Sequence, residues 1–183
     1  LDSVGLITAF FGKGQFVSPE IRKTPEGYLL AQSLEAHYYN LLRPEDIRYG
    51  QWSAEERETK RPRTNTQRLT VRLAIGEIES GFRLVLNVDG PRGLPVLLTL
   101  GFRPGTEIQA APDGLLSTAH GDRFLDKGAA TARYGRHALR LGPGRKDHTL
   151  VAMRGAAAFP ANLQRLPLAW RAPVSETVNL VCL

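Results

Sequence analysis

The stretches Thr70-Val71-Arg72-Leu73-Ala74-Ile75 and Phe82-Arg83-Leu84-Val85-Leu86-Asn87-Val88 decide the fold of this chain. In both, apolar side chains recur at every second residue, which places one set of side chains on a buried face and the other set in water. The residues between them, Ile78-Glu79-Ser80-Gly81, have the composition of a turn. The pattern therefore predicts a hairpin of two half-buried strands.

Short apolar runs bounded by glycine or proline continue to the end of the chain, at residues 94–102, 138–141, 149–154, 166–170 and 176–183. Strands at this spacing predict an all-β fold, an antiparallel β-sandwich of jelly-roll or supersandwich type with room for one short N-terminal helix. We expect residues 69–183 to form the sandwich core. Residues 1–68 should add N-terminal strands and a polar connection to the same sandwich, with the charged stretch 51–68 as an exposed loop or a short helical connection.

Two interpretations compete for residues 25–42. In the first, Thr24 caps a helix with Pro25 in its first turn. The side chains that would then share one helix face are Leu30, Leu34, Tyr38 and Leu41. In the second, Gly27 forms a turn, and residues 28–34 and 36–42 are strands. The periodicity favours the helix and the surrounding β pattern favours the strands, so both interpretations stay open.

Arginine dominates the charge of this chain of 183 residues. Nineteen of its 24 basic residues are arginine, and the formal net charge is +6. The planar guanidinium suits bidentate contact with carboxylate, sulfate or phosphate, so the balance favours an anionic partner. The alternative is that these arginines are solvated strand faces in an arginine-rich sequence.

Cysteine and apolar patterning exclude several classes of protein. The lone Cys182 rules out an internal disulfide framework and a cysteine-rich zinc site, and it is expected to pack as a small hydrophobe. No apolar run reaches the roughly 18 residues of a membrane span, and the first residues lack the pattern of a signal peptide. Because the chain begins with Leu1, we expect a domain from a larger protein.

The candidate catalytic residues are Glu35, His37 and His148. Glu35 and His37 stand beside Tyr38 and Tyr39, close enough in sequence to form an acid–base group if they line a cleft. The same residues also fit the alternating faces of a strand or the surface of a helix. No phosphate-binding loop, nucleophile elbow or paired histidine motif is present, so we expect no cofactor and no metal.

The candidate ligand-binding residues gather in residues 133–148, which are dense in cationic and aromatic groups. We select Arg133, Tyr134, Arg136, Arg140, Arg145 and His148, and add Trp52 as a stacking platform for a sugar ring. A plain hairpin with solvated arginines explains the same residues. Nucleic acid is not an expected partner, because acidic residues dilute the basic stretch near residue 60 and no RNA-binding signature appears.

Three segments resemble the C-terminal β-sandwich of heparinase II/III-type polysaccharide-processing proteins. They are residues 95–105, residues 139–144 together with His148, and the turn at 172–174. In that family such a sandwich follows a helical toroid that carries much of the catalytic cleft. This chain lacks the toroid, so no catalytic residue of the family has a matching position here. The resemblance covers residues 69–183 and rests on the placement of turns.

We therefore expect an accessory β-sandwich of a larger carbohydrate-active protein, such as a polysaccharide lyase or glycoside hydrolase, that supports or contacts an anionic polysaccharide. The chain should have no catalysis of its own and should pack on a neighbouring helical domain. A periplasmic or secreted location follows if the parent protein acts on carbohydrate. Two alternatives remain: an interaction module without a ligand, recognisable by a large exposed apolar patch, and a small stand-alone sandwich enzyme.

Overall fold

The computed structural model describes residues 1–8, 11, 20–39, 63–110, 114–117, 123–150 and 160–183. Within them the chain is all-β and contains no helix. The strands are β1 (Ser3–Thr8), β2 (Glu20–Thr24), β3 (Gly27–Tyr39), β4 (Arg63–Ile78), β5 (Gly81–Asp89), β6 (Pro95–Phe102), β7 (Glu107–Ala110), β8 (Leu115–Ser117), β9 (Arg123–Leu125), β10 (Lys127–Tyr134), β11 (His137–Arg145), β12 (Gln164–Arg171) and β13 (Val174–Cys182).

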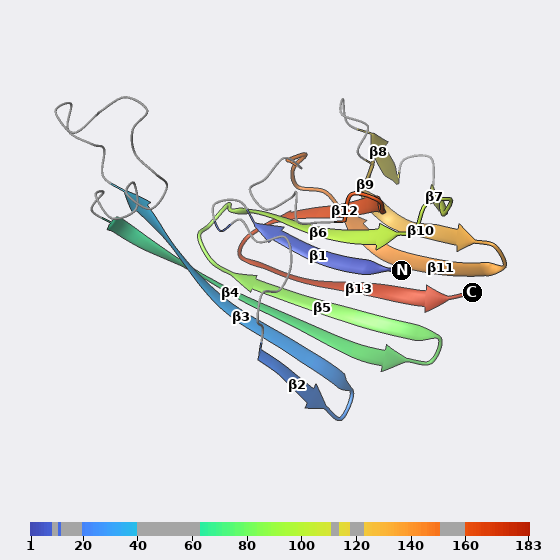
Figure 1. The fold of residues 1–183 in the computed structure, drawn as a ribbon, viewed down its shortest axis with the longest axis horizontal. Helices are drawn as coiled ribbons and strands as arrows, with labels where there is room; N and C mark the ends of the chain where they lie inside the picture. Colours follow the sequence, from blue (N-terminus) through green and yellow to red (C-terminus); the bar gives the residue numbers. More distant parts are fainter. Residues whose placement is uncertain (9–10, 12–19, 40–62, 111–113, 118–122, 151–159) are drawn as a thin grey trace.

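Two antiparallel sheets pack together as a β-sandwich, which confirms the predicted fold class. The larger sheet has the strand order β2-β3-β4-β5-β13-β11-β10-β7, the smaller one has the order β1-β6-β12, and β8 pairs with β9. Figure 1 shows the small sheet lying against the part of the large sheet near β5, β13 and β11, while β2, β3 and β4 extend away from it. Among the described residues, the small sheet therefore covers one part of the large sheet and leaves β2, β3 and β4 without a second layer.

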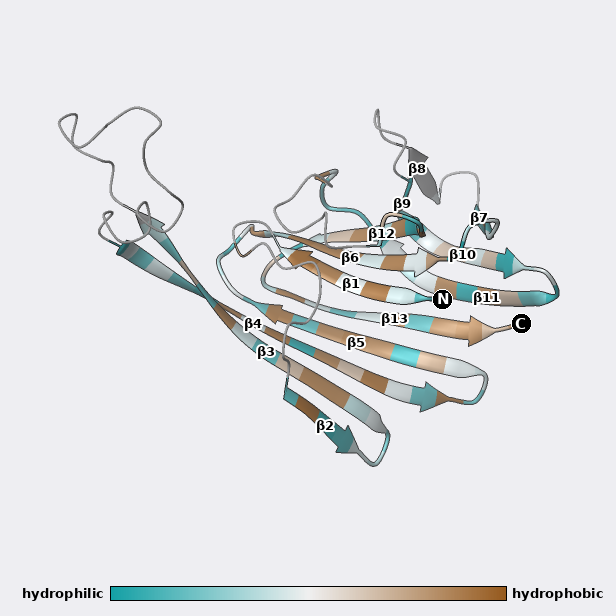
Figure 2. Ribbon diagram, in the orientation of Figure 1, coloured by the Kyte–Doolittle hydropathy of each residue, from teal (hydrophilic) through white to brown (hydrophobic). Residues whose placement is uncertain are grey.

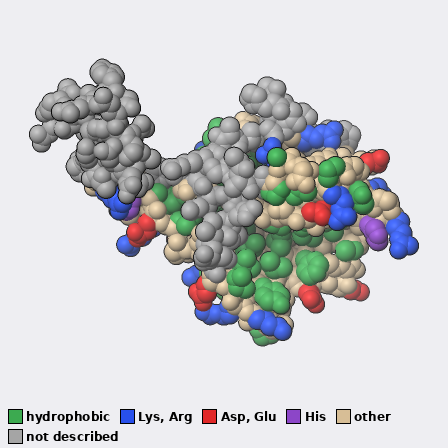
Figure 3. Space-filling view, viewed as in Figure 1, with side chains coloured by type: hydrophobic (Ala, Val, Ile, Leu, Met, Phe, Trp, Pro, Cys, Tyr) green, Lys and Arg blue, Asp and Glu red, His purple; other side chains and the backbone are tan. Residues whose placement is uncertain are grey.

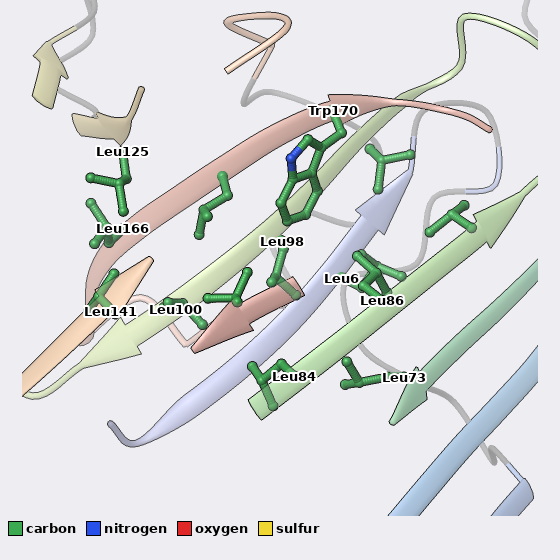
Figure 4. Close-up of a cluster of buried hydrophobic side chains, with 14 of the residues drawn as sticks. Leu6, Leu73, Leu84, Leu86, Leu98, Leu100, Leu125, Leu141, Leu166 and Trp170 are labelled. Atoms are coloured by element: carbon green, nitrogen blue, oxygen red, sulfur yellow. The ribbon is translucent and has the colours of Figure 1, made fainter. Parts of the chain in front are cut away.

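The alternation in β4 and β5 separates two faces of the large sheet. Leu73 and its cross-strand partner Leu86 point to the inner face, toward the small sheet, and both are buried. The next residues along the two strands, Ala74 and Val85, point to the opposite, outer face. In Figure 4 the leucines of β4 and β5 point toward those of β6 and β12. Burial of these side chains, each contributing about 1.5–3 kcal/mol, holds the two layers together.

The small sheet is the most apolar element of the sandwich. Five of the eight residues of β6 are apolar and buried, and Trp170 of β12 is only 1% exposed. Figure 2 shows these strands as largely hydrophobic, whereas the end of β4 near Arg63 is hydrophilic. The small sheet is thus the part of the fold furthest from water.

Residues 27–39 form the single strand β3, which resolves the open choice against a helix. Leu30 and Leu34 point inward opposite Leu73 and Leu69 of β4. A spacing of four residues keeps two side chains on one face of a helix and also on one face of a strand, so these leucines could not separate the two interpretations. Pairing with β4 along the whole strand decides the conformation.

Three further expectations are corrected. Residues 63–68 belong to β4 rather than to an exposed loop or a short helical connection. Residues 51–62 of that stretch lie outside the described residues. Thr149 and Leu150 are not in a strand, and 151–154 are not described. Cys182 is exposed, because it ends β13 where the small sheet no longer covers the large one.

Candidate functional site

Glu35 and His37 lie on the outer face of β3, and each is engaged by a cross-strand neighbour. The Arg68 Nε–H donates to Glu35 Oε1 at 2.8 Å, and His37 Nδ1 lies 2.9 Å from Thr66 Oγ1, within hydrogen-bond distance. The Glu35 and Arg68 side chains are 52% and 82% exposed. Water therefore surrounds this pair, and no cleft wall is described around it.

His148 lies apart from Glu35 and His37, at the small sheet. Its Nε2–H donates to the Val96 carbonyl oxygen at 3.1 Å, and the Leu150 N–H donates to Nδ1 at 3.1 Å. Burial lowers the pKa of His148 below its ordinary value. Both ring nitrogens are thus used by the backbone, which fixes a neutral tautomer, and no contact among the described residues joins His148 to the other two catalytic candidates.

The predicted ligand-binding segment is spread along the β10–β11 hairpin. Arg136 lies in the turn at one end, and Arg145 lies opposite Lys127 at the other. Nine residues of strand separate the two arginines by about 30 Å. Arg145 also donates to Asp147 Oδ1 at 3.0 Å and to Glu176 Oε1 at 2.5 Å. Arg145 and His148 therefore do not join Arg136 in one site.

The remaining candidates divide between the two faces of the large sheet. Tyr134 lies on the inner face, where the guanidinium of Arg103 stacks over its ring at 5.1 Å. Arg103 also donates to Asp2 Oδ1 at 2.8 Å, and this hydrogen bond lowers the pKa of the Asp2 carboxyl. Arg133 and Arg140 are exposed on the outer face. Trp52 lies outside the described residues.

The outer face aligns Arg140 with two arginines that the sequence did not single out, Arg72 and Arg83. We call these three residues the arginine line. Strand β13 lies between β11 and β5, so that Arg140 stands opposite Val181, and Arg83 stands opposite Asn179. From strand spacings, Arg83 lies about 12 Å from Arg140 and about 14 Å from Arg72, measured between Cα atoms. The line crosses the sheet diagonally from β11 to β4.

All three side chains of the arginine line are exposed, and none has an ion-pair partner among the described residues. Four other arginines are neutralised by ion pairs: Arg22, Arg68, Arg103 and Arg145. Arg133 adjoins the line on β10 but faces Glu107 of β7. The positive charge of this face that no described ion pair neutralises therefore lies along the line and at Arg133 beside it.

A polar hollow of about 480 Å³ opens at the Arg72 end of the line. Five of its lining side chains belong to the outer face and can form hydrogen bonds: Thr70, Arg72, Asn87, Asp89 and Ser175. Pro173 adds an apolar surface beside them. The hollow and the line are continuous because Arg72 belongs to both.

Sequence reasoning missed Arg72 and Arg83 because they lie far from residues 133–148 in the chain. Both stand at polar positions of the two alternating stretches, residues 70–75 and 82–88. What places them beside Arg140 is the insertion of β13 between β5 and β11, which is a long-range pairing. The local alternation predicts that Arg72 and Arg83 lie on the solvent-facing side of their strands. No local pattern predicts that they lie near Arg140.

The inner face carries exposed apolar side chains where the small sheet does not cover it. Ile21 of β2, Tyr28 of β3 and Phe82 of β5 point to this face and are 63%, 49% and 46% exposed. Figure 3 shows hydrophobic side chains gathered over β3, β4 and β5, next to the small sheet. Contiguous exposed apolar surface is typical of a contact with another domain or protein.

In the parts of the chain that the structure describes, no three His, Cys, Asp or Glu side chains group as metal ligands would. No described helix is long and apolar enough to cross a bilayer. Comparisons with protein-family models, curated proteins and solved structures found no match to this chain, so its function has to be inferred from its own residues.

Proposed function

We propose that this chain is an accessory β-sandwich that contacts an anionic polysaccharide along the arginine line. The observation that carries the proposal is the contrast in charge pairing. Arg72, Arg83 and Arg140 share the outer face without acidic partners, while Arg22, Arg68, Arg103 and Arg145 are paired. Unpaired, exposed guanidinium groups are suited to bind carboxylate or sulfate groups in bidentate geometry.

The spacing of the line suits a linear polymer better than a compact anion. Steps of about 12 and 14 Å between the Cα atoms are too long for one small ligand to bridge, although long arginine side chains shorten the gap. A polymer that carries a charge on regularly repeated sugar units presents one anion to each arginine in turn. The line therefore supports binding of an extended chain across β4, β5, β13 and β11.

The side chains around the line favour a polysaccharide over a nucleic acid. The bases of a single-stranded nucleic acid stack on aromatic side chains of the protein that binds it. Among the described residues, no Phe, Tyr or Trp lies on the outer face of β4, β5, β13, β11 or β10. These outer faces carry hydroxyl and amide side chains instead, among them Thr70, Asn87, Ser175 and Thr177. Such groups donate to and accept from sugar hydroxyls.

In this proposal the chain binds and orients the polymer, and the chemical reaction belongs to a larger carbohydrate-active protein, such as a polysaccharide lyase or glycoside hydrolase. The hydrogen bonds that Glu35, His37 and His148 form within the fold agree with a chain that binds the polymer and leaves the reaction to another domain. Each of the three already has a hydrogen-bond partner within the fold.

The test is calorimetric titration of the purified chain with polygalacturonate and with a sulfated polysaccharide, at low and at moderate salt. The triple variant Arg72→Ala, Arg83→Ala, Arg140→Ala should weaken binding about tenfold or more, and salt should weaken binding by the wild type. Arg165→Ala is the matched control, because Arg165 is an exposed arginine of the small sheet. Equal losses in the triple variant and the control would contradict the proposal, as would tighter binding of a single-stranded oligonucleotide.

A second candidate function is favoured by the uncovered inner face. Ile21, Tyr28 and Phe82 would pack on a neighbouring helical domain of the same parent protein, as the family resemblance implies. The variant Ile21→Ser, Phe82→Ser should then bind polysaccharide normally but lose association with that domain supplied as a separate chain. Unchanged association would exclude this candidate.

A further inference from the structure

We infer that the polar hollow at the Arg72 end of the line is a subsite that selects a uronate residue with free ring hydroxyls over a sulfated one. This inference rests on the proposed function and names the class of polysaccharide: unsulfated and uronate-containing. The residues that carry it are Arg72 and Asp89, which bring opposite charges to one hollow without pairing to each other.

The geometry of the hollow follows from the strand register. Thr70 stands opposite Asp89, and Arg72 stands opposite Asn87, which in turn stands opposite Ser175. Directly opposite side chains have Cβ atoms about 5 Å apart, and diagonal neighbours such as Arg72 and Asp89 lie about 7–8 Å apart. A single sugar ring therefore reaches both charged groups at once.

Arg72 and Asp89 bind different groups of a ligand. The Arg72 guanidinium donates two parallel hydrogen bonds and binds a carboxylate in bidentate geometry. The Asp89 carboxylate can only accept hydrogen bonds, so it binds the hydroxyl groups of a sugar. Asp89 has no ion-pair partner among the described residues and is exposed. An exposed carboxylate repels a sulfate ester in the same place.

The other lining groups suit a sugar ring. Asn87 offers an amide donor and an amide acceptor, and Thr70 and Ser175 offer hydroxyls, so neighbouring ring hydroxyls find partners on three strands. Pro173 presents an apolar surface to the C–H face of the ring. The volume of about 480 Å³ lies within the range of small-molecule sites, which leaves room for one or two sugar residues.

The arginine line and Asp89 therefore act on different features of the ligand. The line attracts any polyanion, sulfated or not, through charge alone. Asp89 is the acidic group of the hollow, and its charge separates hydroxyl from sulfate at one sugar. Removal of this charge should change the preference between the two ligands, whereas removal of a line arginine should weaken both.

The test measures the affinities of galacturonate hexamers and of the same hexamers O-sulfated on the ring hydroxyls, for wild type and Asp89→Asn, at moderate salt. Asp89→Asn is isosteric, and its melting temperature should match that of the wild type. We expect the variant to bind the sulfated hexamer about threefold to tenfold more tightly and the unsulfated hexamer more weakly. Arg72→Ala should weaken the unsulfated hexamer about tenfold, and Arg165→Ala should change neither ligand.

Three results would overturn the inference. If Asp89→Asn changes both affinities by the same factor, or changes neither, Asp89 does not select the sugar, while salt-sensitive binding that depends on Arg83 and Arg140 leaves the proposed function standing. If the variant lowers the affinity for the sulfated hexamer alone, the assigned role of Asp89 is reversed. If the wild type binds neither hexamer, both the inference and the proposed function fail.

Discussion

The two faces of the large sheet carry alternate residues of the same strands, yet they differ in what fixes their side chains. On the inner face of β5, Leu84 and Leu86 are buried against the small sheet. On the outer face of the same strand, Arg83 is exposed and Asn87 lines the hollow. Packing accounts for the inner residues. No described contact within the fold accounts for the charge of the outer ones.

Along one strand, the buried residues stabilise the fold, and the exposed arginines are the residues to which we assign ligand binding. A buried leucine is retained because its removal leaves a cavity and exposes its neighbours. An exposed arginine without an ion-pair partner contributes little to folding, and its substitution changes stability by only about 0.5 kcal/mol. Arginines of that kind aligned across four strands therefore need an explanation outside the fold, and an anionic ligand supplies one.

The adjacent residues Leu84 and Arg83 give the sharpest test of the comparison and the largest expected effect. Leu84 is 4% exposed and lies between Ile75 and Val178, so Leu84→Ala should lower the free energy of unfolding by about 3 kcal/mol. Arg83→Ala should leave it within about 0.5 kcal/mol and weaken polysaccharide binding. Urea unfolding followed by circular dichroism measures both. Similar losses of stability in the two variants would break the comparison.

A pH titration sharpens the comparison, with a smaller effect. Burial lowers the pKa of His148 below its value of 6.5 in the unfolded chain, and nearby Arg171 also disfavours the charged form. The unfolded chain therefore binds this proton more tightly than the folded one. The stabilisation that neutral His148 provides is complete well above pH 6.5 and is lost as the pH falls below it. Thermal melts at pH 7.5 and 5.5 should show a lower melting temperature in acid.

Two variants identify the group responsible for that loss. His148→Gln should melt lower at pH 7.5 and lack this part of the pH dependence, because its side chain does not titrate. His137→Gln is the matched control, since His137 is exposed in the β10–β11 hairpin, and it should keep the wild-type response. An identical pH response in wild type and His148→Gln would show that another group causes the loss.

Local alternation was sufficient to predict most of the fold. It predicted the β4–β5 hairpin and a strand at residues 94–102, which the structure has as β6, Pro95–Phe102. It did not predict β10, where the inner positions are Ala130 and Ala132, because alanine has a low strand propensity and gives a weak apolar signal. These alanines are nevertheless almost fully buried.

The candidate site was predicted less well, for a different physical reason. A strand pattern shows which face a side chain takes, but not which strand lies next to it. Arg140 was selected from a local cluster, and Arg145 and His148 were grouped with it although the hairpin places them at its opposite end. Ion pairing is equally invisible in the sequence. It neutralises Arg145 and leaves Arg72 without a partner among the described residues.

The smallest expected effect concerns Glu35, whose partner Arg68 lies two outward positions before Arg72 on β4. The pair is exposed, so Glu35→Gln should change the free energy of unfolding by less than about 0.5 kcal/mol. The variant removes the negative charge that neutralises Arg68, which lies about 14 Å from Arg72, the same step that separates Arg72 from Arg83. Polysaccharide affinity should therefore rise, by less than about threefold, in the titration used for the triple variant. A fall in affinity would mean that Glu35 itself contacts the ligand, and the outer face would then bind through acidic as well as basic groups along its whole length.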